Sequence, residues 1–298
     1  MILSDIKYHS PRTLDEALGL LRELEGARVL AGGTDLLVDL KQGLTEAKNI
    51  ISLHHLKELK GIERRKDKIC IGAMSTAQEI LSHSLIREHL PALADAAQSM
   101  ASYPIRTMAT IGGNISSAVP SADLPPPLIA ADAAVELRCS DSSREETLAS
   151  FFSGPRETIC EEGELVAFIL VPVPPAHTGI SFQKFSLREA NALAVASVAA
   201  RITVKDRRVT QAAIILGAVA PTPVKALKTA QFLMGKEPSD SLFDKAASLA
   251  AEESQPISDI RGSEWFRKEL ITVLTRRALK EAQNRASEKR TKEREDHG

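Results

Sequence analysis

Two Gly-Gly pairs, each placed after a short apolar run, constrain this 298-residue chain more than any other feature. The first pair, Gly32-Gly33, follows Val29-Leu30-Ala31, and the second, Gly112-Gly113, follows Met108-Ala109. Glycine adopts positive φ angles and lets a backbone approach a ligand closely, and consecutive N–H groups in such a turn converge on anions. One pair commonly forms an ordinary turn, whereas two pairs at the ends of two strands predict a diphosphate held from two sides. The pattern therefore favours a dinucleotide cofactor.

Polar side chains accompany both Gly-Gly pairs. Thr34 and Asp35 follow the first pair, while Thr110 and Asn114 flank the second and Ser117 lies just downstream. Neutral donors of this kind suit a diphosphate that is bound without a metal ion. The residues alone are equally consistent with a plainer arrangement at the first pair, a strand–helix turn in which Thr34 or Asp35 caps the helix. The chain has neither a Gly-x-Gly-x-x-Gly fingerprint nor a Walker-type loop, so the predicted phosphate site is of a different kind.

Composition limits the classes of protein to which the chain can belong. Its length predicts two domains, and 38 basic against 39 acidic residues give no general attraction for nucleic acid or anionic lipid. No apolar run approaches the ~20 residues of a membrane span, and the first residues lack the pattern of an export signal. The three cysteines, Cys70, Cys139 and Cys160, are too few and too far apart for an iron–sulfur cluster. These features predict a cytoplasmic protein with reduced thiols.

The hydrophobic pattern of the first half alternates helices with short strands. Thr13 and Glu16 predict a capping box at the start of a helix that Gly26 ends. Strands are predicted at 29–31, 49–53, 68–73, 133–137 and 165–171, and helices at 36–40, 75–82 and 91–102. The run Pro125-Pro126-Pro127 predicts a rigid turn outside any helix. The prolines within 172–175 then mark the predicted domain boundary.

Beyond this boundary the pattern changes to longer helices and a few strands. Residues 190–200, which are mostly small, are predicted as a helix suited to close packing, and 212–219 as a buried strand. Residues 263–282 predict an amphipathic helix with Leu270 and Leu274 on one face. The charged segment from Lys280 to Gly298 lacks apolar anchors and predicts frayed helix or disorder.

Two charged residues outside the Gly-Gly pairs are candidates for a cofactor site. Asp123 can accept hydrogen bonds from sugar or ribityl hydroxyls, although an aspartate next to prolines is commonly a turn cap. Lys184 lies on an alternating strand, where it is either solvated or placed to put positive charge near a redox ring. The histidines do not have the spacing of metal ligands. The spacing of the residues also predicts no catalytic nucleophile paired with a base. A cofactor cradle without acid–base apparatus suits hydride or electron transfer.

Several motifs, in one order along most of the chain, resemble the FAD-binding subunit of molybdenum hydroxylases, a family that includes bacterial xanthine dehydrogenase and carbon monoxide dehydrogenase. The segments that carry the resemblance are Ala31–Leu36, Ile71–Ala73, Ile105-Arg106 with Ala109–Asn114, Pro120–Asp123, Phe151–Thr158, Glu164-Leu165, Lys184-Phe185, Leu216–Pro223 and Asp259–Ser263. The chain departs from the family pattern at Tyr103-Pro104 and at Thr107, where relatives usually have Gln and Asn around the Ile-Arg dipeptide.

The resemblance implies an α+β fold. A two-subdomain FAD-binding domain of the vanillyl-alcohol-oxidase/PCMH type is followed by an α+β C-terminal domain with an antiparallel sheet. On this basis residues 1–175 form the FAD-binding domain, with subdomains near 1–55 and 56–175, and residues 176–285 form the C-terminal domain. The charged tail, 286–298, is expected to be disordered.

The resemblance also implies which residues contact FAD. The first loop, Val29 to Leu36, and the second, Thr110 to Asn114, hold the diphosphate, and four residues further along the chain complete the site. The full implied set is Val29, Leu30, Ala31, Gly32, Gly33, Thr34, Asp35, Leu36, Thr110, Ile111, Gly112, Gly113, Asn114, Ser117, Asp123, Val166 and Lys184. It contains no metal ligand and no residue that does the chemistry itself.

A subunit of this family implies partners. The resemblance predicts one partner chain with two 2Fe–2S clusters and a larger one with the molybdenum cofactor, with NAD⁺ as the expected acceptor in the xanthine dehydrogenase branch. Two alternatives stay open: a free-standing flavin reductase or oxidase of the same fold, and an assembly scaffold that has lost its cofactor. Flavin content and turnover without partners distinguish the three.

Overall fold

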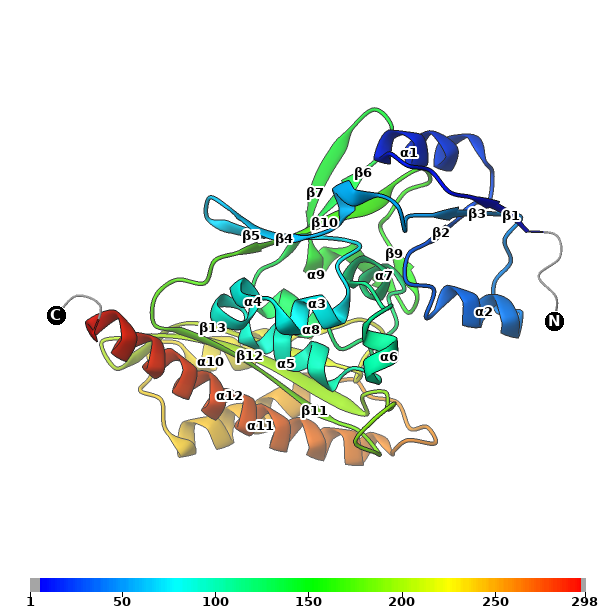
Figure 1. Cartoon of the computed structure of the whole chain (residues 1–298). Helices are drawn as coiled ribbons and strands as arrows, with labels where there is room; N and C mark the ends of the chain where they lie inside the picture. The colour runs from blue at the N-terminus through cyan, green and yellow to red at the C-terminus, as the bar shows by residue number, and fades with distance from the viewer. Residues whose placement is uncertain (1–5, 296–298) are drawn as a thin grey trace.

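A computed structural model describes residues 6–295, which form three larger sheets and a two-stranded one, with helices between and around them (Figure 1). The N-terminal sheet has three parallel strands in the order β1-β3-β2, namely β1 Lys7–His9, β3 Asn49–Ser52 and β2 Arg28–Leu30. Helix α1, Leu14–Glu23, precedes β2, and helix α2, Leu36–Gln42, follows it. We call these five elements the N-terminal module.

Helix α1 begins where the sequence predicts. Thr13 Oγ1 accepts a hydrogen bond from the Glu16 N–H at 3.2 Å, and the Glu16 carboxylate accepts one from the Arg12 N–H at 2.8 Å. Gly26, with a φ of +65°, turns the chain after the helix. The strand that follows ends at Leu30, one residue before the predicted end, and is partly exposed rather than buried.

The middle sheet has five antiparallel strands in the order β4-β5-β10-β6-β7 and contains the predicted strands at 68–73, 133–137 and 165–171. Their bounds are β4 Ile62–Arg65, β5 Lys68–Gly72, β10 Leu165–Pro172, β6 Ala134–Arg138 and β7 Ser143–Thr147. Alternate residues face opposite sides, so Ile69 and Ile71 join one apolar core and Cys70 joins another. The second core includes Leu14 and Leu18 of α1, which attaches the N-terminal module to this sheet.

Short elements cover the first face of the middle sheet. They are α3 Ala77–Ser82, α4 Ser84–His89, α5 Pro91–Ser99, α6 Tyr103–Arg106, α7 Ile111–Ser116, α8 Pro125–Ala130, α9 Leu148–Phe151, and the hairpin β8 Phe152–Gly154 with β9 Glu157–Thr158. The 3₁₀ turn η1, Lys57–Leu59, lies on the other face, because Leu59 belongs to the core that contains Leu14 and Leu18. The helix predicted at 75–82 is confirmed, with a capping box between Thr76 and Glu79.

The predicted turn at Pro125-Pro126-Pro127 is wrong, because these residues form the first turn of α8. The N–H groups of a first turn have no acceptor within the helix, so proline loses nothing there, and its fixed φ suits the helix. All three prolines are buried. A proline run therefore forbids a helix interior but permits a helix start.

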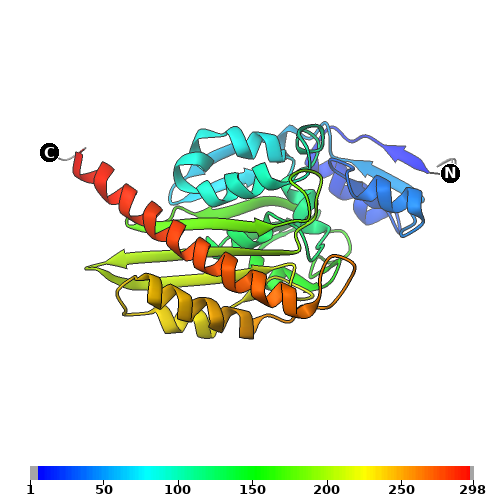
Figure 2. The ribbon, with the colours of Figure 1, turned by 90° about the horizontal axis from the view of Figure 1, so that it is seen from below.

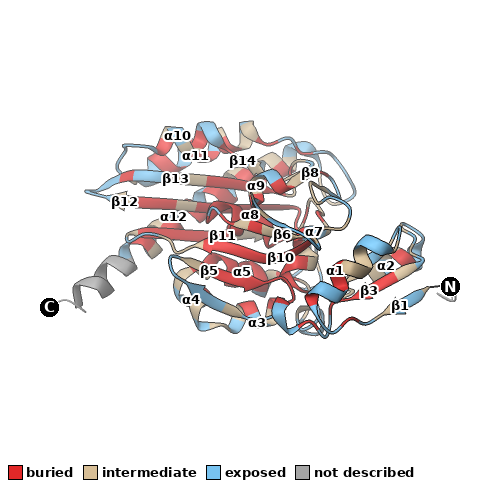
Figure 3. Ribbon diagram, turned by 90° about the horizontal axis from the view of Figure 1, so that it is seen from above, coloured by how far each residue is buried: buried red, intermediate tan, exposed pale blue. Residues whose placement is uncertain are grey.

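The C-terminal sheet has four antiparallel strands in the order β11-β12-β13-β14. The strands are β11 Thr178–Phe185, β12 Ala196–Lys205, β13 Arg208–Gly217 and β14 Val224–Lys225, and the helices after them are α10 Leu227–Leu233, α11 Asp240–Glu253 and α12 Glu264–Glu295. Helix α12 runs along β11 and β12 on one face, and α5 and α8 pack on the other (Figures 1 and 2). Buried residues accordingly follow the central strands of the molecule (Figure 3).

The predicted helix at 190–200 is wrong, since β12 begins at Ala196. Ala199 belongs to the core shared with α5 and α8, whereas Val198 and Ala200 belong to the core under α12. Both faces of this strand are buried over residues 196–200, so this stretch is small and mostly apolar and carries no period that separates strand from helix. The buried strand predicted at 212–219 is confirmed as part of β13.

The last helix is longer than predicted. Helix α12 continues to Glu295, so residues 286–295 are helical rather than disordered, and 296–298 lie outside the described residues. Arg285, directly before this part of the helix, ties α12 to the rest of the chain. Its guanidinium donates to the Ile180 carbonyl at 3.0 Å and pairs with Asp95 at 2.9 Å. Among the described residues, none of the helices combines the length and the apolar character that a bilayer crossing requires.

Candidate functional site

The two Gly-Gly pairs meet in space. A Cβ added to Gly32 would overlap the carbonyl of Met108, so the first loop packs backbone against backbone on the segment before α7. Beside this contact lies a cleft of about 660 Å³, which we call the main cleft. Its lining includes Ala31–Leu36, Asp39, Thr110, Gly113, Asn114, Ser117, Asp123, Arg156 and Asn191–Leu193.

The first Gly-Gly pair presents free main-chain donors to the main cleft. Gly33 has a φ of +71°, and its carbonyl accepts from the Leu37 N–H at 3.3 Å. Within residues 6–295, no acceptor is found for the N–H groups of Gly32, Gly33, Thr34 and Asp35. Asp35 occupies the N-cap position of α2 but its side chain makes no capping hydrogen bond, so the strand–helix turn of the plainer arrangement is present without the side-chain cap. The loop therefore has the donor row that an anion requires.

The second Gly-Gly pair is not a turn, which corrects the prediction from sequence. It forms the first turn of α7, with Thr110 as the N-cap. The N–H groups are used internally: Gly112 donates to the Ala73 carbonyl at 2.9 Å, and Gly113 donates to Thr110 Oγ1 at 3.1 Å. Gly112 is required for packing, because a Cβ there would lie 2.6 Å from the Ala73 Cβ. This motif therefore offers side chains rather than main-chain donors to the cleft.

Those side chains are Thr110, Asn114 and Ser117. Asn114 Nδ2 lies 3.9 Å from Met100 Sδ, and its Oδ1 is buried with no hydrogen-bond partner among the described residues. The Ser117 hydroxyl donates to the Asn114 carbonyl at 3.0 Å. A buried amide oxygen without a partner costs free energy unless another molecule supplies a donor. Asn114 therefore marks a place where a ligand with N–H or O–H groups fits.

Asp123 and Lys184 form a buried ion pair at the wall of the main cleft. Lys184 Nζ donates to Asp123 Oδ2 at 2.7 Å and to the Ser99 carbonyl at 3.1 Å. Burial raises the pKa of Asp123 to about 6, although the Lys184 ammonium opposes the shift. Asp123 Oδ1 is buried and, among the described residues, has no partner. Lys184 is thus neither solvated nor exposed to the cleft, but holds Asp123 in place from behind.

A second hollow of about 490 Å³, the side pocket, shares Val29, Ala31 and Gly113 with the main cleft. Val166 and Leu165 belong to its lining, and an acidic turn, Glu161–Glu164, forms one edge.

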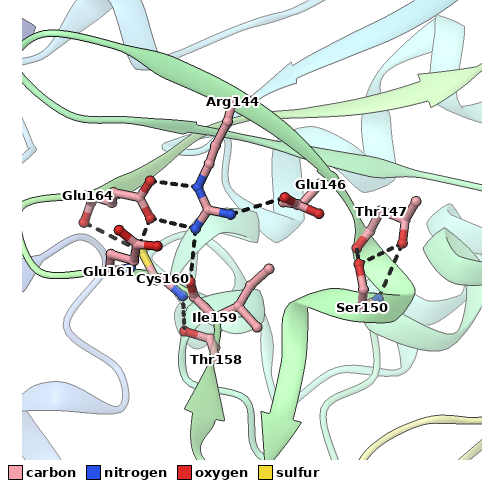
Figure 4. Close-up of polar contacts among 9 residues, drawn as sticks. All are labelled: Arg144, Glu146, Thr147, Ser150, Thr158, Ile159, Cys160, Glu161 and Glu164. Atoms are coloured by element: carbon pink, nitrogen blue, oxygen red, sulfur yellow. Dashed lines mark hydrogen bonds and ion pairs between the residues drawn. The ribbon is translucent and has the colours of Figure 1, made fainter.

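The acidic turn is held by Arg144 (Figure 4). The guanidinium donates to the Ile159 carbonyl at 2.9 Å and pairs with the Glu164 carboxylate at 2.8 Å. The hydrogen bond from Arg144 to Glu164 lowers the pKa of this carboxyl group. Cys160 in the same turn places its thiol 3.5 Å from the Glu164 carbonyl, and burial raises the pKa of this thiol to about 11. The network therefore fixes the edge of the side pocket, and the raised pKa of Cys160 favours the neutral thiol over the thiolate.

Most of the residues predicted from the sequence are brought together by the fold. All but Leu30, Ile111 and Lys184 line the main cleft or the side pocket. Ile111 is fully buried in the core under α7.

Residues that the sequence analysis did not place in the site also line the main cleft. Asn191–Leu193 reaches it from the loop after β11, and Asn191 has a φ of +51°. Asp39 of α2 and Arg156 of the β8–β9 turn also line the cleft, and their side chains form an ion pair. Arg156 belonged to a family motif, but nothing in the sequence pairs it with Asp39, since 117 positions separate them.

Comparison with known proteins places this architecture. Residues 4–174 match the family model of the FAD binding domain in molybdopterin dehydrogenase, and residues 181–282 match that of the CO dehydrogenase flavoprotein C-terminal domain. The chain is 32% identical over 277 residues to the xanthine dehydrogenase FAD-binding subunit of Escherichia coli O157:H7. This alignment covers 92% of this chain and 95% of the relative. The chain is 33% identical over 277 residues to the glyceraldehyde dehydrogenase medium chain of Sulfolobus acidocaldarius, with 93% and 98% covered.

A solved structure agrees with these sequence matches. A chain of carbon monoxide dehydrogenase from Hydrogenophaga pseudoflava superposes with a TM-score of 0.92 at 31% identity, covering 96% of this chain and 99% of that chain. The match confirms the predicted α+β architecture and the family that the motifs resemble. The chain therefore belongs to the FAD-binding medium subunits of the molybdenum hydroxylase family and is an oxidoreductase subunit.

Proposed function

We propose that the main cleft and the side pocket together hold FAD. The observation that carries this proposal is the row of free N–H donors from Gly32 to Asp35, which faces the cleft within a chain of the FAD-binding family. Such a row suits the diphosphate. The residues also fit the rest of the group, because the buried Oδ1 atoms of Asn114 and Asp123 lack partners among the described residues and a dinucleotide has N–H and O–H donors for them.

The roles of the side chains follow from their charges. FAD, when bound, supplies the ability to take up and release one or two electrons. Asp123 is ionised at pH 7, above its pKa of about 6, so it accepts hydrogen bonds from hydroxyl groups. Lys184 balances this charge in a buried place, which keeps the carboxylate oriented toward the cleft. Thr110 accepts the Gly113 N–H and keeps its own hydroxyl hydrogen, so the phosphate charge is met by this hydroxyl and the main-chain N–H groups, all neutral donors.

The proposed function extends to partners and to an acceptor. We infer that this subunit receives electrons from iron–sulfur clusters of a partner chain, that a larger partner holds the molybdenum cofactor, and that NAD⁺ is the acceptor. The acceptor follows from the resemblance to the xanthine dehydrogenase branch, with whose FAD-binding subunit from Escherichia coli O157:H7 the chain shares 32% identity. Similarity to a carbon monoxide dehydrogenase described by its molybdenum cofactor supports the larger partner.

Reconstitution with different flavins tests the proposal. The purified chain is expected to take up one FAD and to bind FMN, which lacks the second phosphate and the adenosine, far more weakly. Reduction of the bound flavin by NADH in a stopped-flow spectrometer tests the acceptor, since the half-reaction runs in both directions. A chain that takes up no flavin contradicts the site and favours a scaffold. Steady NADH turnover with a small acceptor, unchanged by partner chains, favours a free-standing reductase.

A further inference from the structure

The main cleft lies between two parts of the chain that are far apart in sequence. Helix α2 of the N-terminal module lies at one end of the molecule, beside α6 and α7 (Figure 1). The residues that line the cleft from α2 and the loop after it are Leu36, Asp39, Leu44 and Thr45, and those opposite include Ala101, Ile105 and Arg156. A molecule in this cleft therefore has the N-terminal module on one side and the middle of the chain on the other.

One ion pair joins the two sides. Arg156 Nη1 donates to Asp39 Oδ2 at 2.6 Å, and Nη2 lies 3.4 Å from Asp39 Oδ1, so both nitrogens face one carboxylate. The Asp39 side chain is 15% exposed and that of Arg156 is 52% exposed. A paired fork of this kind fixes orientation better than a single contact does.

The two ends of this pair differ in how firmly they are held. Arg156 stands at a tight turn with a φ of +63°, and its N–H donates to the Ala118 carbonyl at 2.9 Å, directly after α7. Asp39 stands on a seven-residue helix in which Leu40 is the only buried residue. Helix α2 also ends at Gly43, which has a φ of +71°. The main chain at Arg156 is thus held in place by its hydrogen bond to Ala118. Helix α2, which carries Asp39, has little buried surface to hold it against the rest of the chain.

We propose that the Asp39–Arg156 pair is a clasp that holds α2 against the β8–β9 turn and so slows the release of FAD from the main cleft. This inference rests on the proposed function, because it assigns the ligand of the cleft. In this proposal FAD leaves as α2 moves away from the β8–β9 turn, and the Asp39–Arg156 pair separates in that movement. The clasp acts on the rate at which FAD leaves and contributes no group that takes part in electron transfer.

Release kinetics of FAD from the loaded full chain test the clasp. FAD fluorescence is recovered on dilution, and its rise gives the dissociation rate. D39N and R156Q are each expected to release FAD about three- to fivefold faster, the range that an ion pair of this exposure allows. The double variant D39N/R156Q is expected to be no faster than either single one, since the pair is already broken in both. R207Q, which breaks the exposed pair between Arg207 of the β12–β13 turn and Glu237 of the loop between α10 and α11, is the matched control and is expected to release FAD at the wild-type rate.

Two further measurements keep the test decisive. Raising the salt concentration from about 0.05 M to about 0.5 M is expected to speed release from the wild type more than from D39N, because salt screens only an intact pair. The exchanged pair, D39R/R156D, is expected to recover most of the wild-type rate. Release rates of D39N and R156Q that equal the wild-type rate overturn the clasp and leave the FAD site standing. Effects that multiply in the double variant overturn it as well, and a wild-type chain that binds no FAD overturns the proposed function together with the clasp.

Discussion

Gly112 and Gly113 are neighbours in α7, yet their surroundings differ. A Cβ on Gly112 would lie 2.6 Å from the Ala73 Cβ and 2.8 Å from the Ala73 carbonyl oxygen, whereas a Cβ on Gly113 would meet only Thr110 Oγ1 at 3.0 Å and the Ala31 Cβ at 3.7 Å. Neither glycine has a positive φ. Packing, and not backbone conformation, therefore explains Gly112, whereas Gly113 is constrained only by the Thr110 hydroxyl.

Alanine substitutions separate these two glycines. G112A is expected to lower the free energy of unfolding by about 2 kcal/mol, since the new methyl group must displace a neighbouring backbone. G113A is expected to cost less, because the hydroxyl of a side chain can shift and alanine favours the helix by up to about 1 kcal/mol. Urea unfolding of the two variants beside the wild type measures the difference. Equal losses at both positions would show that the contact with Ala73 is not the reason for Gly112.

The Asp123 carboxyl makes stability depend on pH. Its pKa is raised from 3.8 to about 6 in the folded chain, so the folded state binds a proton more tightly than the unfolded state. The resulting stabilisation is complete below about pH 4 and is lost as the pH rises through about 6, with a total of about 3 kcal/mol. Without flavin, the wild type is expected to lose this stability relative to D123N between pH 4 and pH 6.5. Parallel pH profiles of the two proteins in urea unfolding would contradict the raised pKa.

At the scale of elements, the start of α12 depends on one buried arginine. Arg267, 4% exposed, donates to the carbonyls of Val195 and Ala218, each at 2.9 Å, and pairs with Asp259 at 2.7 Å. These contacts tie the helix to the residues just before β12 and just after β13. They also hold the Asp259–Ser263 turn that leads into α12, where the Asp259 carboxylate accepts the Arg261 N–H at 2.8 Å.

Removing this arginine is expected to weaken the whole C-terminal sheet. R267M removes the donor of the Val195 and Ala218 carbonyls and the cationic partner of Asp259, and is expected to cost about 3 kcal/mol. K268M, at the next position, removes only an exposed pair with Glu264 and is expected to change stability by less than about 0.5 kcal/mol. Thermal unfolding of both variants provides the comparison. A loss of stability as small for R267M as for K268M would mean that Arg267 does not anchor α12.

An element could be predicted from the sequence where its signal is local. It could not be predicted where its conformation depends on the layers that pack around it. Helix α1 and strand β10 were predicted because a cap or an apolar run between turn residues defines them locally. Residues 196–200 were assigned to a helix because both faces of β12 are buried, a fact that belongs to the layers around the strand. The second Gly-Gly pair was assigned to a turn because its real constraint, Ala73, lies 39 positions earlier in the chain.

For the whole molecule, the site depends on contacts between segments that are distant in sequence. The first loop meets the second motif through Gly32 and Met108, and Asp123 meets Lys184 across 61 positions. The family motifs identified most of these residues but not their arrangement, so the Asp39–Arg156 pair and the Asn191–Leu193 loop came only from the structure. The sequence also predicts main-chain N–H donors at both Gly-Gly pairs. In the structure these N–H groups are free only at the first pair, Gly32-Gly33.

We propose that the contact between the first loop and the segment before α7 shapes the FAD site. Equilibrium titration of apo-protein with FAD, followed by the quenching of flavin fluorescence, tests it with G32A and with the control G19A, which places a methyl group on α1 where no atom lies within 4 Å. The account predicts one FAD per chain for the wild type and G19A, and a loss of at least about tenfold in affinity, or 1.4 kcal/mol, for folded G32A. Wild-type affinity in G32A, or a wild-type chain that binds no FAD, would contradict it.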